Sequence, residues 1–115
     1  MKNWLIFVVC SVASIGIQAK EPVDNLGVRA ISVADFGTAE ARLEAQLRRD
    51  PGLPEALLNL AHVYRATGRH QSAVKLYKWV LASPEVELIH GQSLISSHEL
   101  ARRGLDSRQT LAVLR

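Results

Sequence analysis

The side chains of this chain that are best suited to acid–base chemistry or metal binding are its four histidines. They are His62, His70, His90 and His98. No two of them lie at the i, i+4 spacing of metal sites, and none belongs to a closely spaced Cys/His pattern. The motifs of phosphate-binding loops, zinc proteases, serine hydrolases and dinucleotide-binding folds do not occur in the sequence either. We therefore expect a protein that is not an enzyme, with no metal site and no cofactor.

The N-terminus has the organisation of a secretory signal peptide, which we assign to residues 1–19. Lys2 supplies a positive charge, and an apolar run follows from Trp4 to Ile17. This run is shorter than the roughly 20 residues that span a membrane. Ala19 is a small residue at the expected cleavage site. Cleavage there predicts an exported protein of the periplasm or cell envelope with no membrane span, and the alternative is an uncleaved, membrane-tethered N-terminus.

Removal of residues 1–19 changes the chemistry of the mature chain in two ways. It removes Cys10, so no cysteine is left for disulfide or thiol chemistry. It also removes Lys2, which leaves 13 basic against 11 acidic side chains and a formal charge of +2. So small a charge, with aromatic residues at only 5%, does not favour nucleic-acid binding. Hydrophobic residues make up 48% of the chain, which favours a folded globular protein.

The first helix that the apolar spacing predicts begins at Asp35, after a lead-in of residues 20–34 that we expect to be extended. Its apolar stripe recurs at helical spacing. The stripe consists of Phe36, Ala39, Leu43 and Leu47. Pro51 ends the helix, because proline lacks the amide donor that a helix interior needs.

Two more helices are predicted on either side of a turn of a few residues, so they must pack antiparallel. One opens at Pro54, where a missing amide costs nothing, and ends at Gly68. The other runs from Gln71 to Ala82. Their inward faces contain Leu57, Leu60, Ala61 and Tyr64 in the first, and Ala73, Leu76, Tyr77, Val80 and Leu81 in the second.

Residues 85–115 have a different character. Two apolar runs within residues 86–95 flank a His-Gly-Gln turn, which predicts a small β-hairpin resting on the helices. Ser96 and Glu99 then form an S-x-x-E capping box that starts a last helix. We expect Gly104 to end this helix and a short terminal helix to follow.

An internal repeat of 34 residues relates the first predicted helix to the third. Residues 54–84 resemble one full tetratricopeptide repeat, and residues 35–51 resemble the second helix of a preceding one. The matching positions are Leu57, Leu60, Ala61, Tyr64, Gly68, Ala73, Tyr77, Val80 and Pro84, with Ala39 and Pro51 before them. The resemblance implies an all-α fold, an antiparallel helical repeat of about one and a half repeats over residues 35–84. The hairpin and capping helix of residues 85–115 complete it.

The resemblance also implies a function in protein–protein interaction, as an adaptor or assembly factor. In the family, one face of each repeat's first helix lines a groove that receives a partner segment. In this chain that face holds Glu55, Leu58, Asn59, His62, Arg65 and Ala66. Leu58 would face outward, Asn59 could bond a peptide backbone and Arg65 a carboxylate. The alternatives are a solvated helix face, a structural homodimer that buries the same face, or a binding edge on the hairpin.

Overall fold

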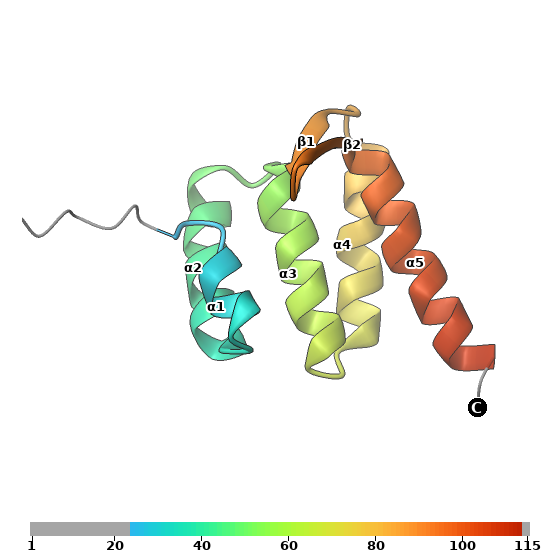
Figure 1. Cartoon of the computed structure of the whole chain (residues 1–115), viewed down its shortest axis with the longest axis horizontal. Helices are drawn as coiled ribbons and strands as arrows, with labels where there is room; N and C mark the ends of the chain where they lie inside the picture. Colours follow the sequence, from blue (N-terminus) through green and yellow to red (C-terminus); the bar gives the residue numbers. More distant parts are fainter. Residues whose placement is uncertain (1–23, 114–115) are drawn as a thin grey trace, which may run out of the picture.

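The computed structural model describes residues 24–113, with side chains described as far as Asp106. The signal peptide predicted for residues 1–19 lies outside the described residues. In chain order the elements are α1 (Val28–Ser32), α2 (Phe36–Arg49), α3 (Pro54–Ala66), α4 (His70–Ala82), β1 (Glu87–His90), β2 (Ser93–Ser96) and α5 (Ser97–Val113). Figure 1 shows α2, α3, α4 and α5 side by side, with α1 against α2 and the hairpin above α3 and α4.

The limits of the three repeat helices follow from the residues that the sequence analysis identified. The Asp35 side chain accepts a hydrogen bond from the Thr38 amide at 3.3 Å and so caps α2. Pro54 is the first residue of α3, as predicted. Gly68 has a φ of 82° in the turn after α3, a left-handed conformation that glycine adopts without strain. The predictions for these helices are confirmed.

The core consists of two apolar clusters, and α3 contributes to both. One cluster joins α3 to α4, α5 and β1. The other joins α3 to α1 and α2. Ala39, Ala61 and Ala73 are buried where the helices meet. Their small side chains allow the helix axes to approach closely, so each helix covers the apolar stripe of its neighbour.

The arrangement of the helices confirms the predicted fold class. The helices α3 and α4 form one helix–turn–helix unit, which α2 precedes and α5 follows. The protein is thus mostly helical, with about one and a half repeats, a two-stranded antiparallel hairpin and a C-terminal helix.

The predicted hairpin is present and is fixed to the helices at its base. β1 and β2 pair antiparallel, and Gly91 at the turn has a φ of 64°. At the base, the Val86 amide donates to the Ser97 hydroxyl at 3.1 Å, and the Ser97 amide donates to the Val86 carbonyl at 2.8 Å. Leu88 is buried in the core, so the hairpin rests on the helices as expected.

The expectation of an extended lead-in is wrong for residues 28–32, which form α1. The cause is Asp24, whose carboxylate accepts hydrogen bonds from the amides of Val28 at 2.8 Å and Arg29 at 3.0 Å. The same carboxylate forms an ion pair with Arg42 of α2 at 3.1 Å. A helix of five residues is too short to show a helical period, so its sequence pattern did not indicate it.

The expected break at Gly104 is also wrong, because α5 continues without interruption to Val113. The start of the helix agrees with the capping box, since the Ser96 hydroxyl accepts the Glu99 amide at 3.2 Å. Gly104 is buried inside the helix, against the ring of Tyr77. This glycine provides space for a neighbouring side chain and does not end the helix, and no separate terminal helix follows within the described residues.

Candidate partner-binding groove

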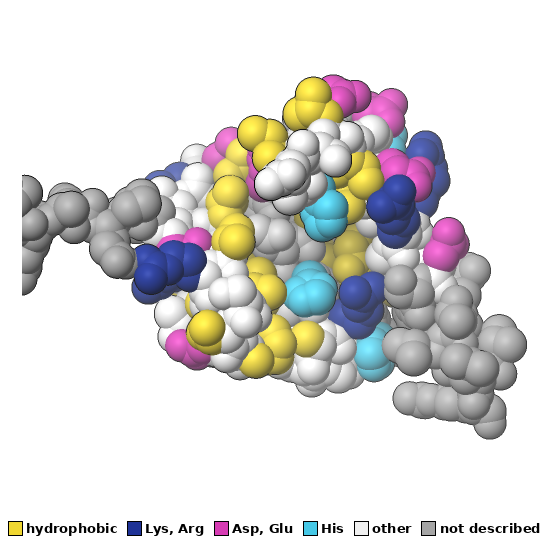
Figure 2. Space-filling view, viewed as in Figure 1, with side chains coloured by type: hydrophobic (Ala, Val, Ile, Leu, Met, Phe, Trp, Pro, Cys, Tyr) yellow, Lys and Arg dark blue, Asp and Glu magenta, His cyan; other side chains and the backbone are white. Residues whose placement is uncertain are grey.

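A groove of about 570 Å³ runs along α3, between α1 and α5. The residues before α1 and the hairpin also contribute to its walls. Figure 2 shows this face of the molecule, where histidine and basic side chains lie beside hydrophobic ones around a hollow. The volume is within the range of about 300–1,000 Å³ that is typical of ligand-binding clefts.

Most of the predicted site residues lie on this groove, because α3 presents them at successive turns. The lining residues from α3 are Glu55, Leu58, Asn59, His62 and Arg65. Ala66, at the C-terminal end of α3, is exposed and lies outside the lining. The structure thus brings together five of the six residues on one helix face.

Leu58 does not face outward, which corrects the sequence-based expectation. Its side chain is only 8% exposed and belongs to the cluster that contains Tyr77 and Leu88. Helix α5 contacts α3, and Leu88 of the hairpin packs in the same cluster as Leu58, on the side that the repeat pattern alone leaves open. Leu58 therefore forms part of an apolar floor of the groove instead of projecting into it.

Asn59 already has a backbone partner within the chain. Its side-chain amide donates a hydrogen bond to the Leu26 carbonyl oxygen at 3.0 Å. Leu26 lies just before α1, so this bond holds the wall of the groove against α3. The role expected of Asn59, bonding the backbone of a peptide partner, stays a prediction, and in the structure its amide nitrogen bonds the protein's own backbone.

Arg65 makes one end of the groove electropositive, and His62 lies three residues before it on α3. Burial lowers the pKa of His62, and the positive charge of Arg65 lowers it further. No ion pair of Arg65 occurs within the described side chains. The Arg65 guanidinium, which is neither fully buried nor fully exposed, is therefore available for an anionic group.

Glu55 carries the opposite charge in the first turn of α3. Its Oε2 atom is buried and has no hydrogen-bond partner among the described residues. A buried carboxylate oxygen without a donor costs free energy.

Several groove residues come from elements that the repeat pattern does not cover. Val28 of α1 and Ile89 of β1 are large apolar side chains with 55% and 83% of their surface exposed. Leu100 and Arg103 of α5 line the groove on the other side. The sequence indicated the hairpin only as a separate edge, and α1 gave no signal. The sequence signal that could have indicated this wall is the apolar residue Ile89, which lies next to the His-Gly-Gln turn of the hairpin.

The groove lining provides apolar, polar and ionic contacts. Within residues 24–106, no three His, Cys, Asp or Glu side chains are placed to hold a metal ion together. Among the helices that the structure describes, none has the length and apolar character needed to cross a membrane. The groove combines an apolar floor, exposed apolar rims and two ionic groups, Glu55 and Arg65, that have no ion-pair partner among the side chains described.

Sequence comparison agrees with this architecture. The family profile described as tetratricopeptide repeat matches residues 30–89, which is more than half of the chain. The chain belongs to the tetratricopeptide repeat family. Tetratricopeptide repeats generally mediate protein–protein interaction. The match begins within α1 and ends in β1, so β2 and α5 lie beyond the tetratricopeptide match. No curated protein and no solved structure matches the chain.

Proposed function

We propose that this protein is a non-catalytic interaction module that binds a segment of a partner protein in the groove along α3. The observation that carries the proposal is the groove itself, which lies on the first helix of the full repeat. Its exposed apolar rims at Val28 and Ile89 are features that a partner segment would cover, and so is Arg65, which has no ion pair in the described part of the chain. The module acts as an adaptor or assembly factor, since the groove offers contact surface without a constellation for chemistry.

The location of this activity is the periplasm or cell envelope. That part of the proposal rests on the sequence of residues 1–19. N-terminal sequencing of the protein isolated from its native host tests it. A mature chain that starts at Lys20 supports export with cleavage. An N-terminus at residue 1 or 2 in a membrane fraction would instead support the tethered form.

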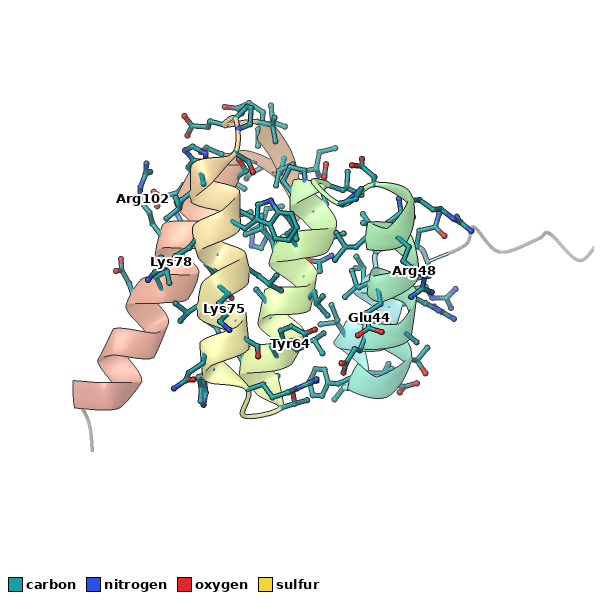
Figure 3. The ribbon with its side chains drawn as sticks, turned by 180° about the vertical axis from the view of Figure 1, so that it is seen from behind. Glu44, Arg48, Tyr64, Lys75, Lys78 and Arg102 are labelled. Carbon is teal, nitrogen blue, oxygen red and sulfur yellow. The ribbon has the colours of Figure 1, made fainter. Side chains whose placement is uncertain are left out.

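Site-specific photo-crosslinking tests the binding face. A photoreactive amino acid replaces His62, which lines the groove, and in a matched variant it replaces Lys75. Lys75 is on an exposed part of α4, on the side shown in Figure 3. We expect a crosslink to a partner protein in the native host from position 62 and none from position 75. Crosslinks from position 75 alone, or from neither, would contradict the proposal.

A homodimer is the second candidate, because the hairpin exposes an apolar pair on one face and has two open edges. Ile89 and Leu94 lie directly opposite each other in the two strands. Their exposed fractions are 83% and 69%. Two-stranded sheets leave both edges free to accept another strand. Light scattering over a range of protein concentrations tests this candidate. A molar mass that rises to twice the monomer value in the protein, but stays at the monomer value in Ile89→Lys, would favour the dimer over the adaptor.

A further inference from the structure

The side of α4 that faces away from the rest of the molecule has cations but no carboxylate. The exposed residues of this helix recur at helical spacing, so they share one side: Gln71, Ser72, Lys75, Lys78, Trp79 and Ala82. The sequence of α4 contains no Asp or Glu. Its other sides contact α3 and α5, and no described residue covers this one. We call these six residues the outer face of α4.

The positive charge of the outer face continues onto the neighbouring helix α5. Lys75 and Lys78 have no ion pair within the described side chains. Arg102 of α5 is exposed, and its pair with Glu99 is 3.8 Å long. Glu99 also accepts a hydrogen bond from Arg103 at 3.0 Å, so it is shared between two cations. Figure 3 shows Lys75, Lys78 and Arg102 on the same side of the molecule, on two adjacent helices.

The two carboxylates of α2 do not offset this charge, because each has a cation of its own nearby. Glu40 pairs with Arg69 at 2.6 Å. Glu44 lies four residues before Arg48, the spacing at which opposite charges on a helix attract each other. The charge on the side of α4 and α5 is therefore positive.

Trp79 adds a large apolar side chain to these cations. It is 47% exposed, although an indole ring contributes most when it is covered. Trp79 follows Lys75 by four residues, so the two side chains lie one turn apart on the same row of the helix. Tryptophan beside lysine is typical of surfaces that rest at the level of the headgroups of a bilayer.

The position of the outer face favours a lipid surface over an acidic protein segment. Lys75, Lys78 and Trp79 lie outside the lining of the groove. A bound protein segment gains specificity from pockets for its side chains, whereas a bilayer is flat and needs none. The groove is seen from the front in Figure 2, and Lys75 and Lys78 are seen from behind in Figure 3. Contact with a bilayer through α4 would leave the groove accessible.

We propose that the outer face of α4, together with Arg102, binds the surface of a bilayer that contains anionic lipids. The cations of Lys75, Lys78 and Arg102 bind lipid phosphates, and the Trp79 ring inserts among the headgroups. The contact is peripheral and reversible, since each cation strengthens binding to an anionic surface by only about fivefold. This goes beyond the proposed function, because it orients the protein on a membrane whatever the groove binds.

The fluorescence of Trp79 in the presence of lipid vesicles tests the proposal. The protein is isolated from its host as Trp4→Phe, so that Trp79 is the only tryptophan in whichever form is recovered. Vesicles of phosphatidylcholine are compared with vesicles of phosphatidylcholine and phosphatidylglycerol in equal amounts. We expect the mixed vesicles to shift the emission of Trp79 to shorter wavelength at a lipid concentration roughly tenfold lower or less. High salt should reverse the shift, because it screens exposed charges.

Two double variants with the same change of charge locate the contact. Lys75→Gln with Lys78→Gln should weaken binding to the mixed vesicles about twentyfold. Arg65→Gln with Arg103→Gln removes two cations from the groove lining and should leave vesicle binding unchanged. Circular dichroism checks that both remain folded. Emission of Trp79 that does not respond to the mixed vesicles, or an equal loss in both double variants, would overturn the proposal. Protection of Trp79 from iodide quenching by polyglutamate, but not by vesicles, would overturn it in favour of an acidic protein.

Discussion

Gly104 of α5 lies directly against the ring of Tyr77 of α4, and a Cβ atom at position 104 would come within 3.0 Å of three ring carbons. Tyr77 is 5% exposed, so its ring has little room to move. This contact explains why a residue with poor helix propensity stands inside a continuous helix. The close approach of α4 and α5 depends on it.

Replacing this glycine should therefore destabilise the fold. Alanine at position 104 gains about 1 kcal/mol in helix propensity, but it overpacks the core, which typically costs about 1–3 kcal/mol. We expect Gly104→Ala to lower the free energy of unfolding in urea. Gly37→Ala is the matched control, because Gly37 is a helical glycine in α2 and a Cβ atom there would meet no heavy atom within 4 Å. It should gain up to about 1 kcal/mol. A gain in both variants would show that the Tyr77 ring moves freely.

The ion pair between Glu40 and Arg69 should stabilise the fold only while Glu40 is ionised. The two guanidinium nitrogens donate to the two carboxylate oxygens at 2.7 and 2.6 Å, and the guanidinium also lies 4.4 Å from the centroid of the Tyr64 ring. The hydrogen bonds from Arg69 lower the pKa of Glu40 below its ordinary value of 4.5. We expect Glu40→Gln to lower the melting temperature at pH 7 by about 2–4 °C.

The pH dependence of this difference follows from the sign of the shift. Because the pKa of Glu40 is lower in the folded state, its ionised form favours folding above pH 4.5, and this contribution disappears as the pH falls through the folded-state pKa. The difference in melting temperature between the protein and Glu40→Gln should therefore shrink below pH 4.5. Glu44→Gln, an exposed change on the same helix (Figure 3), should have a smaller effect. An equal loss in both variants would mean that the geometry of the Arg69 pair adds nothing.

Loss of the hydrogen bond from Asn59 to Leu26 should release the N-terminal wall of the groove. We expect Asn59→Ala to speed hydrogen exchange at the Ile31 amide of α1 by about fivefold, since one hydrogen bond contributes about 1 kcal/mol. Amides in α4 should be unaffected. Gln71→Ala, at an exposed position of α4, serves as the control and should leave the exchange of α1 unchanged. Uniform acceleration throughout the helices of Asn59→Ala would show global destabilisation instead of local release.

The imidazole of His62 should titrate below its ordinary pKa of 6.5. Its pKa, measured from ring proton shifts by NMR, should rise in Arg65→Gln but stay below 6.5, because burial is the larger cause of the shift. The unfolded chain then takes up the proton at higher pH than the folded chain, so stability should fall as the pH drops below 6.5 and the fall should end below the folded-state pKa. His62→Gln should remove this contribution. A titration unchanged by Arg65→Gln would exclude the charge of Arg65 as a cause.

The parts of the fold that could be predicted from the sequence are those that local patterns determine. The limits of α2, α3 and α4 follow from Asp35, Pro54 and Gly68, each of which acts on its own turn or cap. The hairpin likewise follows from two apolar runs around Gly91. These signals are local, so a single sequence suffices to recognise them.

Three of the differences from the sequence-based expectations have a common cause, because each involves a partner distant in the sequence. Leu58 appeared to face outward, but residues of α4 and β1 bury it. Asn59 appeared free for a ligand, but it bonds a carbonyl oxygen 33 residues earlier. Gly104 resembled a helix end, but Tyr77 determines its role. The face of α3 could be predicted from the repeat pattern, whereas the walls that turn this face into a groove depend on tertiary contacts.

The reciprocal hydrogen bonds between Val86 and Ser97 have a consequence for how this protein can vary. They close the base of the hairpin, so the end of α4 and the start of α5 are held together independently of the number of residues in the strands between them. Insertions or deletions near Gly91 would lengthen or shorten one rim of the groove without changing the register of the two helices. The rim of the groove, which contacts a partner, can therefore change in length during evolution while the packing of α4 against α5 stays the same.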